Sequence, residues 1–324
     1  MKSSSPIIIQ HFNCSSMGTR FNFLTYGLDE AFFSSAKTFI SNELERIEQK
    51  FTRYNDNSEI SKINKLAAME PFPTDSETIS LLALCKEYYT STNQLFDITV
   101  GRYTILGSDP FPSETGPDSM LSSQRILSEN ASPGADNIIL DFDGSTVFFQ
   151  DTRISIDLGG IGKGYALEKI RQYCAENHIT NALISFGDSS ITTLGSHPHG
   201  DYWPIGIQHS FSAGSPIYTF QLNNSSLSTS GNNPNNQMKY GANGHIINPL
   251  TGKFQKELKT VSVVADSPIV AEILSTSLFI AGDKDKAEII SKFKPMESIA
   301  ISYNQMKEYK LINLNQELNF ANNE

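Results

Sequence analysis

The residues best suited to chemistry lie in one stretch, Ile154–Ala166, where glycines and Lys163 follow Asp157. The β-branched residues before Asp157 predict a short strand, and the residues after the glycines predict a helix. Glycine lets the backbone approach a ligand closely, and a helix start presents free N–H groups and a positive dipole end. The stretch therefore has the chemistry of a phosphate or diphosphate site, with the spacing of neither a P-loop nor a GxGxxG loop. A tight strand-to-helix connection without a ligand is the second interpretation.

The elements that must position this stretch follow from hydrophobic periodicity and turn residues. Apolar residues at helical spacing predict helices at 29–51, 59–66, 76–89, 162–178, 268–281 and 283–292. Alternating or short apolar runs predict two strands within 7–26, a hairpin at 138–150, and strands at 182–186, 203–208, 217–222, 260–265 and 298–303. Hairpins mixed with helices predict an α+β fold with antiparallel or mixed sheets and packed helices around a shared core.

The length of 324 residues allows one large domain or two ordinary ones, and a hydrophobic content of 39% is enough for a sizeable core. We expect a single domain at 7–318, with a surface excursion rich in Ser, Pro and Gly at about 107–136, and tails at 1–6 and 319–324. The net charge of −10 argues against nucleic acid or an anionic membrane surface as the main partner.

Three cysteines without a CxxC pair predict neither a disulfide framework nor a zinc site, and Cys85 and Cys174 fall on apolar helix faces typical of core residues. The apolar run 7–9 is too short for a signal-peptide core, and no segment is long enough to insert in a membrane. As written, the chain is expected in the cytoplasm, and in the periplasm if its N-terminus has been trimmed.

Seven motifs along the chain stand in the order seen in one family. They are Met17-Gly18-Thr19, the run 53–61, Phe96-Asp97-Ile98-Thr99-Val100-Gly101, the run 157–166, Ser228-Thr229-Ser230-Gly231, the run 245–252 and the run 271–278. Together they resemble the ApbE-type FAD:protein FMN transferases, from Met17 to about Gly282. The resemblance implies a single large ApbE-like domain related to the T-fold.

The resemblance also implies a reaction. Enzymes of this type bind FAD and Mg²⁺, split the diphosphate, release AMP and join FMN through its phosphate to a threonine hydroxyl of a target protein. Cleaving a diphosphate requires neutralised charge at the bridging and leaving oxygens, which a cation and a divalent metal supply. The implied partners are therefore FAD, Mg²⁺ and an acceptor protein whose identity the sequence does not name.

The implied metal ligands include Glu272 and Thr276, which lie four residues apart and so share one face of the predicted helix. A carboxylate and a hydroxyl are hard oxygen ligands suited to Mg²⁺. The family pattern adds a backbone carbonyl from the glycine-rich turn, here assigned to Gly160. A solvated glutamate and a helix-facing threonine are the alternative interpretation of the pair.

The resemblance assigns further residues to the cofactor and to catalysis. Lys163 lies along the cofactor and is a catalytic candidate, and His245 is predicted either to act as a base on the acceptor hydroxyl or to bind FAD. A structural histidine is the alternative. Cofactor contacts are predicted for Met17, Tyr54, Asp157, Lys163, Asp188, Ser230, His245 and Ile247. Tyr and Met are also common core residues, and a simple turn would equally explain the serine.

At several positions the sequence differs from the family pattern. Glu272 stands where Asp is usual, Asp188 follows Gly187 where a second glycine is usual, Arg102 replaces a proline, and Asn248 replaces an aspartate. The glutamate is one methylene longer than Asp, and Mn²⁺, being larger than Mg²⁺, should accept this longer arm more easily. Two other functions therefore stand beside the transferase: a Mg²⁺-dependent FAD pyrophosphatase that yields FMN and AMP, and a flavin-binding or scaffold paralogue without turnover.

Overall fold

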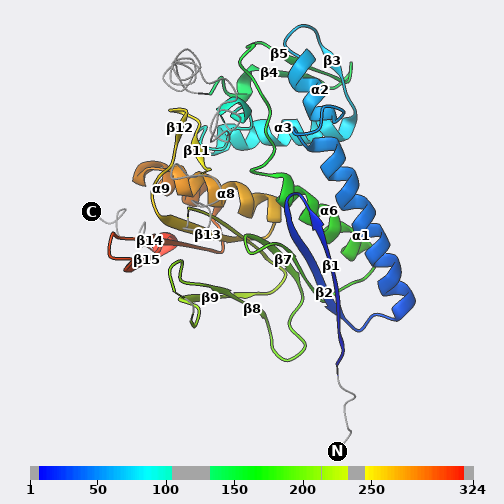
Figure 1. The fold of residues 1–324 in the computed structure, drawn as a ribbon, viewed down its shortest axis with the longest axis vertical. Helices are drawn as coiled ribbons and strands as arrows, with labels where there is room; N and C mark the ends of the chain where they lie inside the picture. Colours follow the sequence, from blue (N-terminus) through cyan, green and yellow to red (C-terminus); the bar gives the residue numbers. More distant parts are fainter. Residues whose placement is uncertain (1–6, 104–131, 213, 233–244, 317–324) are drawn as a thin grey trace, which may run out of the picture.

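The computed structural model describes residues 7–103, 132–212, 214–232 and 245–316 (Figure 1). The predicted tails at 1–6 and 319–324 lie outside these residues, as does the predicted surface excursion up to residue 131. In the described part of the chain, no helix is long and apolar enough to cross a membrane.

A single large antiparallel sheet is the base of the fold. Among the described residues it has eight strands in the order β1-β2-β6-β7-β10-β13-β14-β15. Their bounds are β1 (Ile9–Ser16), β2 (Thr19–Tyr26), β6 (Ala182–Phe186), β7 (Ser190–Leu194), β10 (Ser226–Gly231), β13 (Lys259–Ala265), β14 (Glu297–Tyr303) and β15 (Tyr309–Asn313). Every neighbouring pair is antiparallel, which confirms the predicted fold class.

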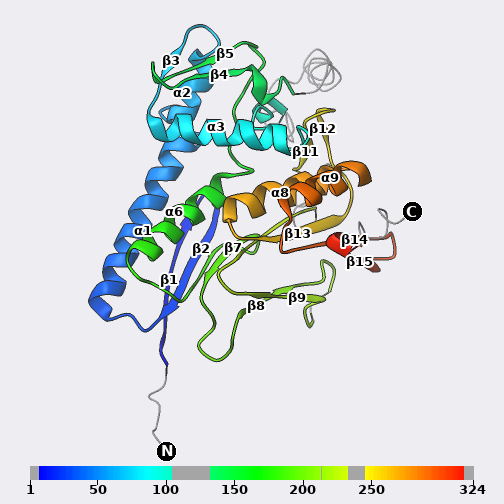
Figure 2. The same cartoon turned by 180° about the vertical axis from the view of Figure 1, so that it is seen from behind.

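Helices pack on this sheet and on one another, as Figures 1 and 2 show from opposite sides. The helices are α1 (Glu30–Phe51), α2 (Glu59–Leu66), α3 (Ser76–Ser91), α6 (Gly162–Glu176), α8 (Pro268–Ile280) and α9 (Asp283–Phe293), with a short 3₁₀ turn η1 (Ala135–Asn137). Their starts follow from capping side chains, because Asp29, Ser58 and Asp75 each accept a backbone N–H of the first turn. Helix α8 begins at Pro268, a position where proline costs nothing.

Three small sheets complete the described fold. Strands β3 (Phe72–Pro73), β5 (Thr146–Phe149) and β4 (Ile138–Asp141) form one, β8 (Trp203–Ile207) and β9 (Tyr218–Leu222) a second, and β11 (Ile247–Asn248) and β12 (Lys253–Phe254) a third. The predicted hairpin at 138–150 is confirmed as β4 and β5, with Asp143 and Gly144 in its turn.

The main core lies between the helices and the first strands of the large sheet. Fully buried side chains from α1, α3, α6, β2 and β6 meet there, among them Ile40, Leu82, Ile170, Phe23 and Ile184. The same core holds Cys85 and Cys174, as predicted for small apolar residues. A second cluster joins α8 and α9 to β13, and a third covers the other part of the sheet under β8 and β9.

The strand predicted at 154–157 is wrong. Within the described residues, only Ser155 forms an isolated parallel bridge, with Val100. The side-chain amide of Asn64 takes the place of a neighbouring strand, because it donates to the carbonyl of Ile156 (2.9 Å) and accepts its N–H (2.7 Å). The N–H of Asp157 is bound to the carbonyl of Ile98 at 2.8 Å. The backbone hydrogen-bonding groups of Ile156 and Asp157 therefore find their partners in the Asn64 side chain and the loop at Ile98, not in a neighbouring strand.

Candidate functional site

The glycine-rich turn ends in the first turn of α6, as predicted. The N–H of Gly162 donates to the carbonyl of Leu158 at 2.7 Å, which closes the turn directly before the helix. Ile161 occupies the N-cap position, and its aliphatic side chain has no atom that could accept a hydrogen bond from the first turn. The first-turn N–H groups and the positive end of the helix dipole therefore need a negative partner from elsewhere in the fold.

Glu272 of α8 supplies that negative charge. Its Oε2 accepts the backbone N–H of Gly164, and its Oε1 lies 2.6 Å from the Nζ of Lys163. The residue is only 3% exposed, and a buried carboxylate is stable only with a charged or hydrogen-bonded partner. The structure thus brings together Lys163 and Glu272, which the sequence analysis assigned to the cofactor and to the metal.

Gly164 permits this close approach of the two helices. A Cβ at this position would lie 2.7 Å from Glu272 Oε2 and 2.8 Å from the carbonyl oxygen of Pro268. Any larger residue would force apart the first turns of α6 and α8. The neighbouring residues Lys163 and Gly164 therefore have different roles. Lys163 provides the positive charge, and Gly164 leaves the space that the close contact between α6 and α8 requires.

Hydroxyl groups from β10 and α8 meet beside Glu272. Ser230 Oγ lies 2.9 Å from Thr276 Oγ1 and 2.8 Å from Ser275 Oγ. Ser275 in turn donates to the backbone carbonyl of Glu272 at 3.0 Å and lies 3.1 Å from Ser228 Oγ. The predicted residues Ser230 and Thr276 are therefore direct neighbours. The sequence analysis missed Ser275, for which the i+3 spacing after Glu272 was the available signal.

Asp157 is held by Arg53, a second residue that the sequence analysis did not assign. The Asp157 carboxylate lies 3.0 Å from Arg53 Nε and accepts the N–H of Gly159 at 2.8 Å. Arg53 Nη1 also donates to the carbonyl of Gly101 at 3.2 Å. The Arg53 guanidinium lies 4.5 Å from the ring centre of Tyr54, which is 83% exposed. The position of Arg53 directly before Tyr54 in a matched motif was the signal for it.

Two other predicted residues lie at one end of the large sheet. Met17 is in the turn between β1 and β2, where its N–H donates to Glu48 at 2.9 Å, and Asp188 is exposed in the turn between β6 and β7. Ser190, the first residue of β7, has its Oγ 3.5 Å from Glu272 Oε1. The start of β2 pairs with the end of β6. Both turns therefore lie at the same end of these strands, where Ser190 approaches Glu272.

The remaining predicted residues lie in two loops. His245 is exposed before β11, and Ile247 is buried within it. Ser132 connects this region to the Phe96–Gly101 motif, because its N–H donates to the carbonyl of Pro249 at 2.7 Å and its Oγ contacts Thr99. A Cβ at Gly160 would lie 3.5 Å from the Phe96 ring, so this backbone also borders that motif. The roles of these residues stay predictions.

Comparison with known proteins decides the family. The family model described as "ApbE family" matches residues 17–300, which is most of the chain. This chain belongs to the ApbE family. A protein named FAD:protein FMN transferase from Chlamydia muridarum is 30% identical over 261 residues, covering 78% of each chain. A protein of the same name from Klebsiella pneumoniae is 26% identical over 292 residues, covering 89% of this chain and 88% of its own.

Solved structures of ApbE proteins share the fold. Flavin transferase ApbE from Vibrio cholerae superposes with a TM-score of 0.78 at 22% identity, covering 95% of this chain and 97% of its own. The ApbE protein from Thermotoga maritima gives a TM-score of 0.76 at 23% identity, covering 94% and 96%. The antiparallel sheet with its packed helices is thus an ApbE fold, as the sequence motifs predicted.

The metal site assigned from the sequence stays a prediction. In the described part of the chain, no three His, Cys, Asp or Glu side chains gather to hold a metal ion. Mg²⁺, however, is commonly bound through one or two carboxylates together with waters and substrate phosphates. Glu272, the Thr276 hydroxyl and the Gly160 carbonyl would be such a set of hard oxygen donors.

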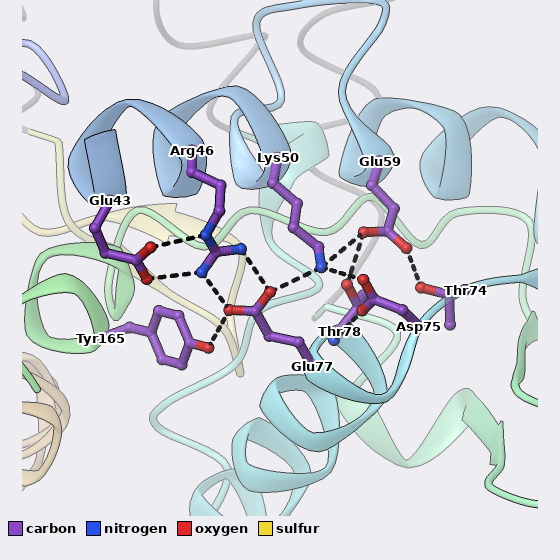
Figure 3. Close-up of polar contacts among 9 residues, drawn as sticks. All are labelled: Glu43, Arg46, Lys50, Glu59, Thr74, Asp75, Glu77, Thr78 and Tyr165. Carbon is purple, nitrogen blue, oxygen red and sulfur yellow. Dashed lines mark hydrogen bonds and ion pairs between the residues drawn. The ribbon is translucent and has the colours of Figure 1, made fainter. Parts of the chain in front are cut away.

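A network of charged residues supports the other side of α6 (Figure 3). Tyr165 donates to Glu77 at 2.7 Å, and Glu77 also accepts from Arg46 at 2.7 Å and from Lys50 at 2.9 Å. The hydrogen bond from Arg46 is the main cause that lowers the pKa of the Glu77 carboxyl well below its usual range. Helix α6 is therefore held on one face by α8 and on the other by α1 and α3.

Proposed function

We propose that this protein is an FAD:protein FMN transferase that uses Mg²⁺ or Mn²⁺. In this reaction the threonine oxygen of an acceptor protein attacks the phosphorus on the FMN side of the FAD diphosphate. The bond between that phosphorus and the bridging oxygen breaks, and AMP leaves with the bridging oxygen. The acceptor hydroxyl loses its proton, and the product carries FMN through a phosphoester. Membership of the ApbE family supports this proposal, together with the names of the relatives.

One observation in the structure carries the proposal: the start of α6 brings Lys163 and Glu272 to a glycine-rich turn beside Ser230 and Thr276. A helix start and a lysine are suited to the negative charge of a diphosphate. The metal ion, held by Glu272, Thr276 and Gly160, would neutralise charge on the diphosphate oxygens. Arg53 and Asp157 would fix the shape of the turn, because their ion pair ties it to the end of α1.

The remaining assignments belong to the same proposal. His245 is the candidate base for the proton of the acceptor hydroxyl, because imidazole accepts a proton near neutral pH. Met17, Tyr54, Asp188 and Ile247 are candidate contacts for FAD. The exposed ring of Tyr54, braced by Arg53, is suited to stacking on a planar ring.

The decisive experiment incubates the pure protein with FAD and Mg²⁺, with and without a protein acceptor that contains a threonine target. The proposal predicts AMP release together with a covalent mass increase of the acceptor equal to bound FMN. AMP and free FMN without an acceptor would show the pyrophosphatase instead. FAD binding without AMP under either condition would identify the non-catalytic paralogue, and a chelator should abolish turnover in both enzymatic cases.

A further inference from the structure

The Glu272 carboxylate has both of its oxygens engaged. Oε1 lies 2.6 Å from Lys163 Nζ, and Oε2 accepts the N–H of Gly164. The side chain is almost fully buried, and the Lys163 ammonium already compensates its single negative charge. The hydroxyl of Ser190 lies farther away, 3.5 Å from Oε1. A divalent cation that binds Glu272 would lie next to the ammonium, and the repulsion between the two cations favours displacing one of the two nitrogen donors.

Of the two nitrogen donors, Gly164 and Lys163, only the lysine can leave. The N–H of Gly164 belongs to the first turn of α6, and it could move away only if that turn unwound. Helix α6 is also held from its other face, where Tyr165 donates to Glu77. The Lys163 ammonium, by contrast, sits at the end of a flexible four-carbon stem and its side chain remains 24% exposed. The lysine can swing toward solvent while the helix stays in place.

We propose that Lys163 is an exchangeable counter-ion: it neutralises Glu272 until a divalent cation binds there, and is then released toward the diphosphate of the flavin nucleotide. The inference rests on the proposed function, because it takes the metal and the diphosphate from it. Metal binding makes the lysine charge available beside the glycine-rich turn, and the diphosphate attracts that charge away from Glu272. Metal and nucleotide therefore favour each other's binding, and this coupling is reciprocal.

The first test measures Mn²⁺ binding to FAD-free protein by the loss of the free-ion signal in electron paramagnetic resonance. Lys163→Met removes the competing cation and should bind Mn²⁺ about tenfold more tightly or better, as expected when a charge-assisted contact no longer competes. Lys163→Arg keeps the charge and should resemble the wild type. Lys169→Met, the same charge change on the same helix, should leave the affinity unchanged.

Three outcomes would overturn the proposal. They are equal or weaker Mn²⁺ binding in Lys163→Met than in the wild type, absence of binding in both, and an equal gain in Lys169→Met. Circular dichroism establishes that each variant is folded. Should Lys163→Met fail to fold, Lys163→Gln serves in its place, with the same expected gain in affinity.

The second test measures FAD affinity by flavin fluorescence, with Mg²⁺ or with a chelator, at times short compared with any turnover. With Mg²⁺, Lys163→Met should weaken FAD binding about tenfold or more, because the released lysine is missing. With the chelator the loss should be small, because the wild-type lysine is then bound to Glu272. An equal loss in both conditions would contradict the exchange. Absence of AMP release would refute the transferase without changing either binding result, so the two proposals fail separately.

Discussion

At the scale of single residues, the Glu272 carboxylate combines several contacts. It caps the first turn of α6, neutralises Lys163 and is the candidate metal ligand. Its extra methylene compared with Asp lets the carboxylate reach both donors across the interface between α6 and α8. The same length moves the carboxylate outward from its own helix, and Mg²⁺ tolerates displaced ligands poorly because it requires octahedral geometry.

Substitution of Glu272 tests this balance. Glu272→Asp should preserve or raise Mg²⁺-dependent AMP release, because the shorter arm loosens the contact with Lys163. Glu272→Gln should abolish turnover, because it removes the charge. The wild type should work at least as well with Mn²⁺ as with Mg²⁺. The measurement is the rate of AMP formation from FAD, and full activity of Glu272→Gln would show that this residue is not a metal ligand.

At the scale of elements, the site depends on the contact between the first turns of α6 and α8. Gly164 allows that contact, because its missing side chain leaves room for Glu272 and the carbonyl of Pro268. Gly162 lies in the same turn, yet a Cβ placed there would meet no atom within 4 Å in the described part of the chain. Gly162 is therefore a matched control for substitutions at Gly164, because only Gly164 lies in the close helix contact.

We expect Gly164→Ala to lower the free energy of unfolding by about 1–3 kcal/mol, because the added methyl overpacks the helix contact. The variant should also bind FAD more weakly, since Glu272 is displaced. Gly162→Ala should be neutral or should stabilise the protein by up to about 1 kcal/mol, because alanine favours a helix. Chemical denaturation measures both, and equal stability of the two variants would contradict the close packing at Gly164.

The charged network around Glu77, on the face of α6 opposite α8, contributes to the stability of the folded protein in acid. The folded state holds the pKa of Glu77 far below the ordinary value of 4.5, chiefly through the hydrogen bond from Arg46. The unfolded chain therefore takes up this proton first as the pH falls. The stability contributed by Glu77 is fully present above about pH 4.5 and is lost progressively below it.

Glu77→Gln should accordingly lower the free energy of unfolding near pH 7 by about 1–3 kcal/mol, because charge-assisted hydrogen bonds to Arg46 and Lys50 are lost. The variant should also lose less stability between pH 5 and 3 than the wild type does. Glu87→Gln, at an exposed position of the same helix, is the control and should follow the wild-type curve. Parallel acid curves for Glu77→Gln and the wild type would refute the assignment.

At the scale of the whole molecule, the fold brings one end of the central strands of the large sheet together with the starts of α6 and α8. Met17, Asp188 and Ser230 lie on turns or strand ends at the same end of the strands, and α8 lies against β10. Residues from both halves of the sequence therefore reach the same region. The core beneath them contains Cys85 and Cys174, whereas Cys14 is half-buried on β1.

Thiol reactivity reports on that core. Burial raises the pKa of Cys174 to about 12 and raises that of Cys85 as well, so neither thiol forms the reactive thiolate at pH 8. We expect a thiol reagent to modify only Cys14 in the native protein, slowly because its pKa is also raised by burial. All three cysteines should react in denaturant. Mass spectrometry identifies the labelled residues, and rapid native labelling at Cys85 or Cys174 would mean that the core opens.

Local signals in the sequence were sufficient for most elements. The helices α1, α2 and α3 begin within one residue of the predicted starts, and Asp29, Ser58 and Asp75 cap them there, because capping depends only on residues within one turn. The order of seven motifs likewise identified the family without any structure. The strand predicted at 154–157 failed because Asn64, far away in the sequence, satisfies that backbone.

The arrangement of charges in the site was decided only by the tertiary structure. Gly164 and Glu272 are 108 residues apart, and their contact exists because α6 and α8 pack closely at a glycine. Motif matching assigned Lys163 to the cofactor and Glu272 to a metal, but it contained no information that the two side chains bind each other. Arg53 was likewise visible in a motif, yet its ion pair with Asp157 depends on where α1 ends relative to the glycine-rich turn. Such pairings depend on distances between elements, which local sequence patterns do not determine.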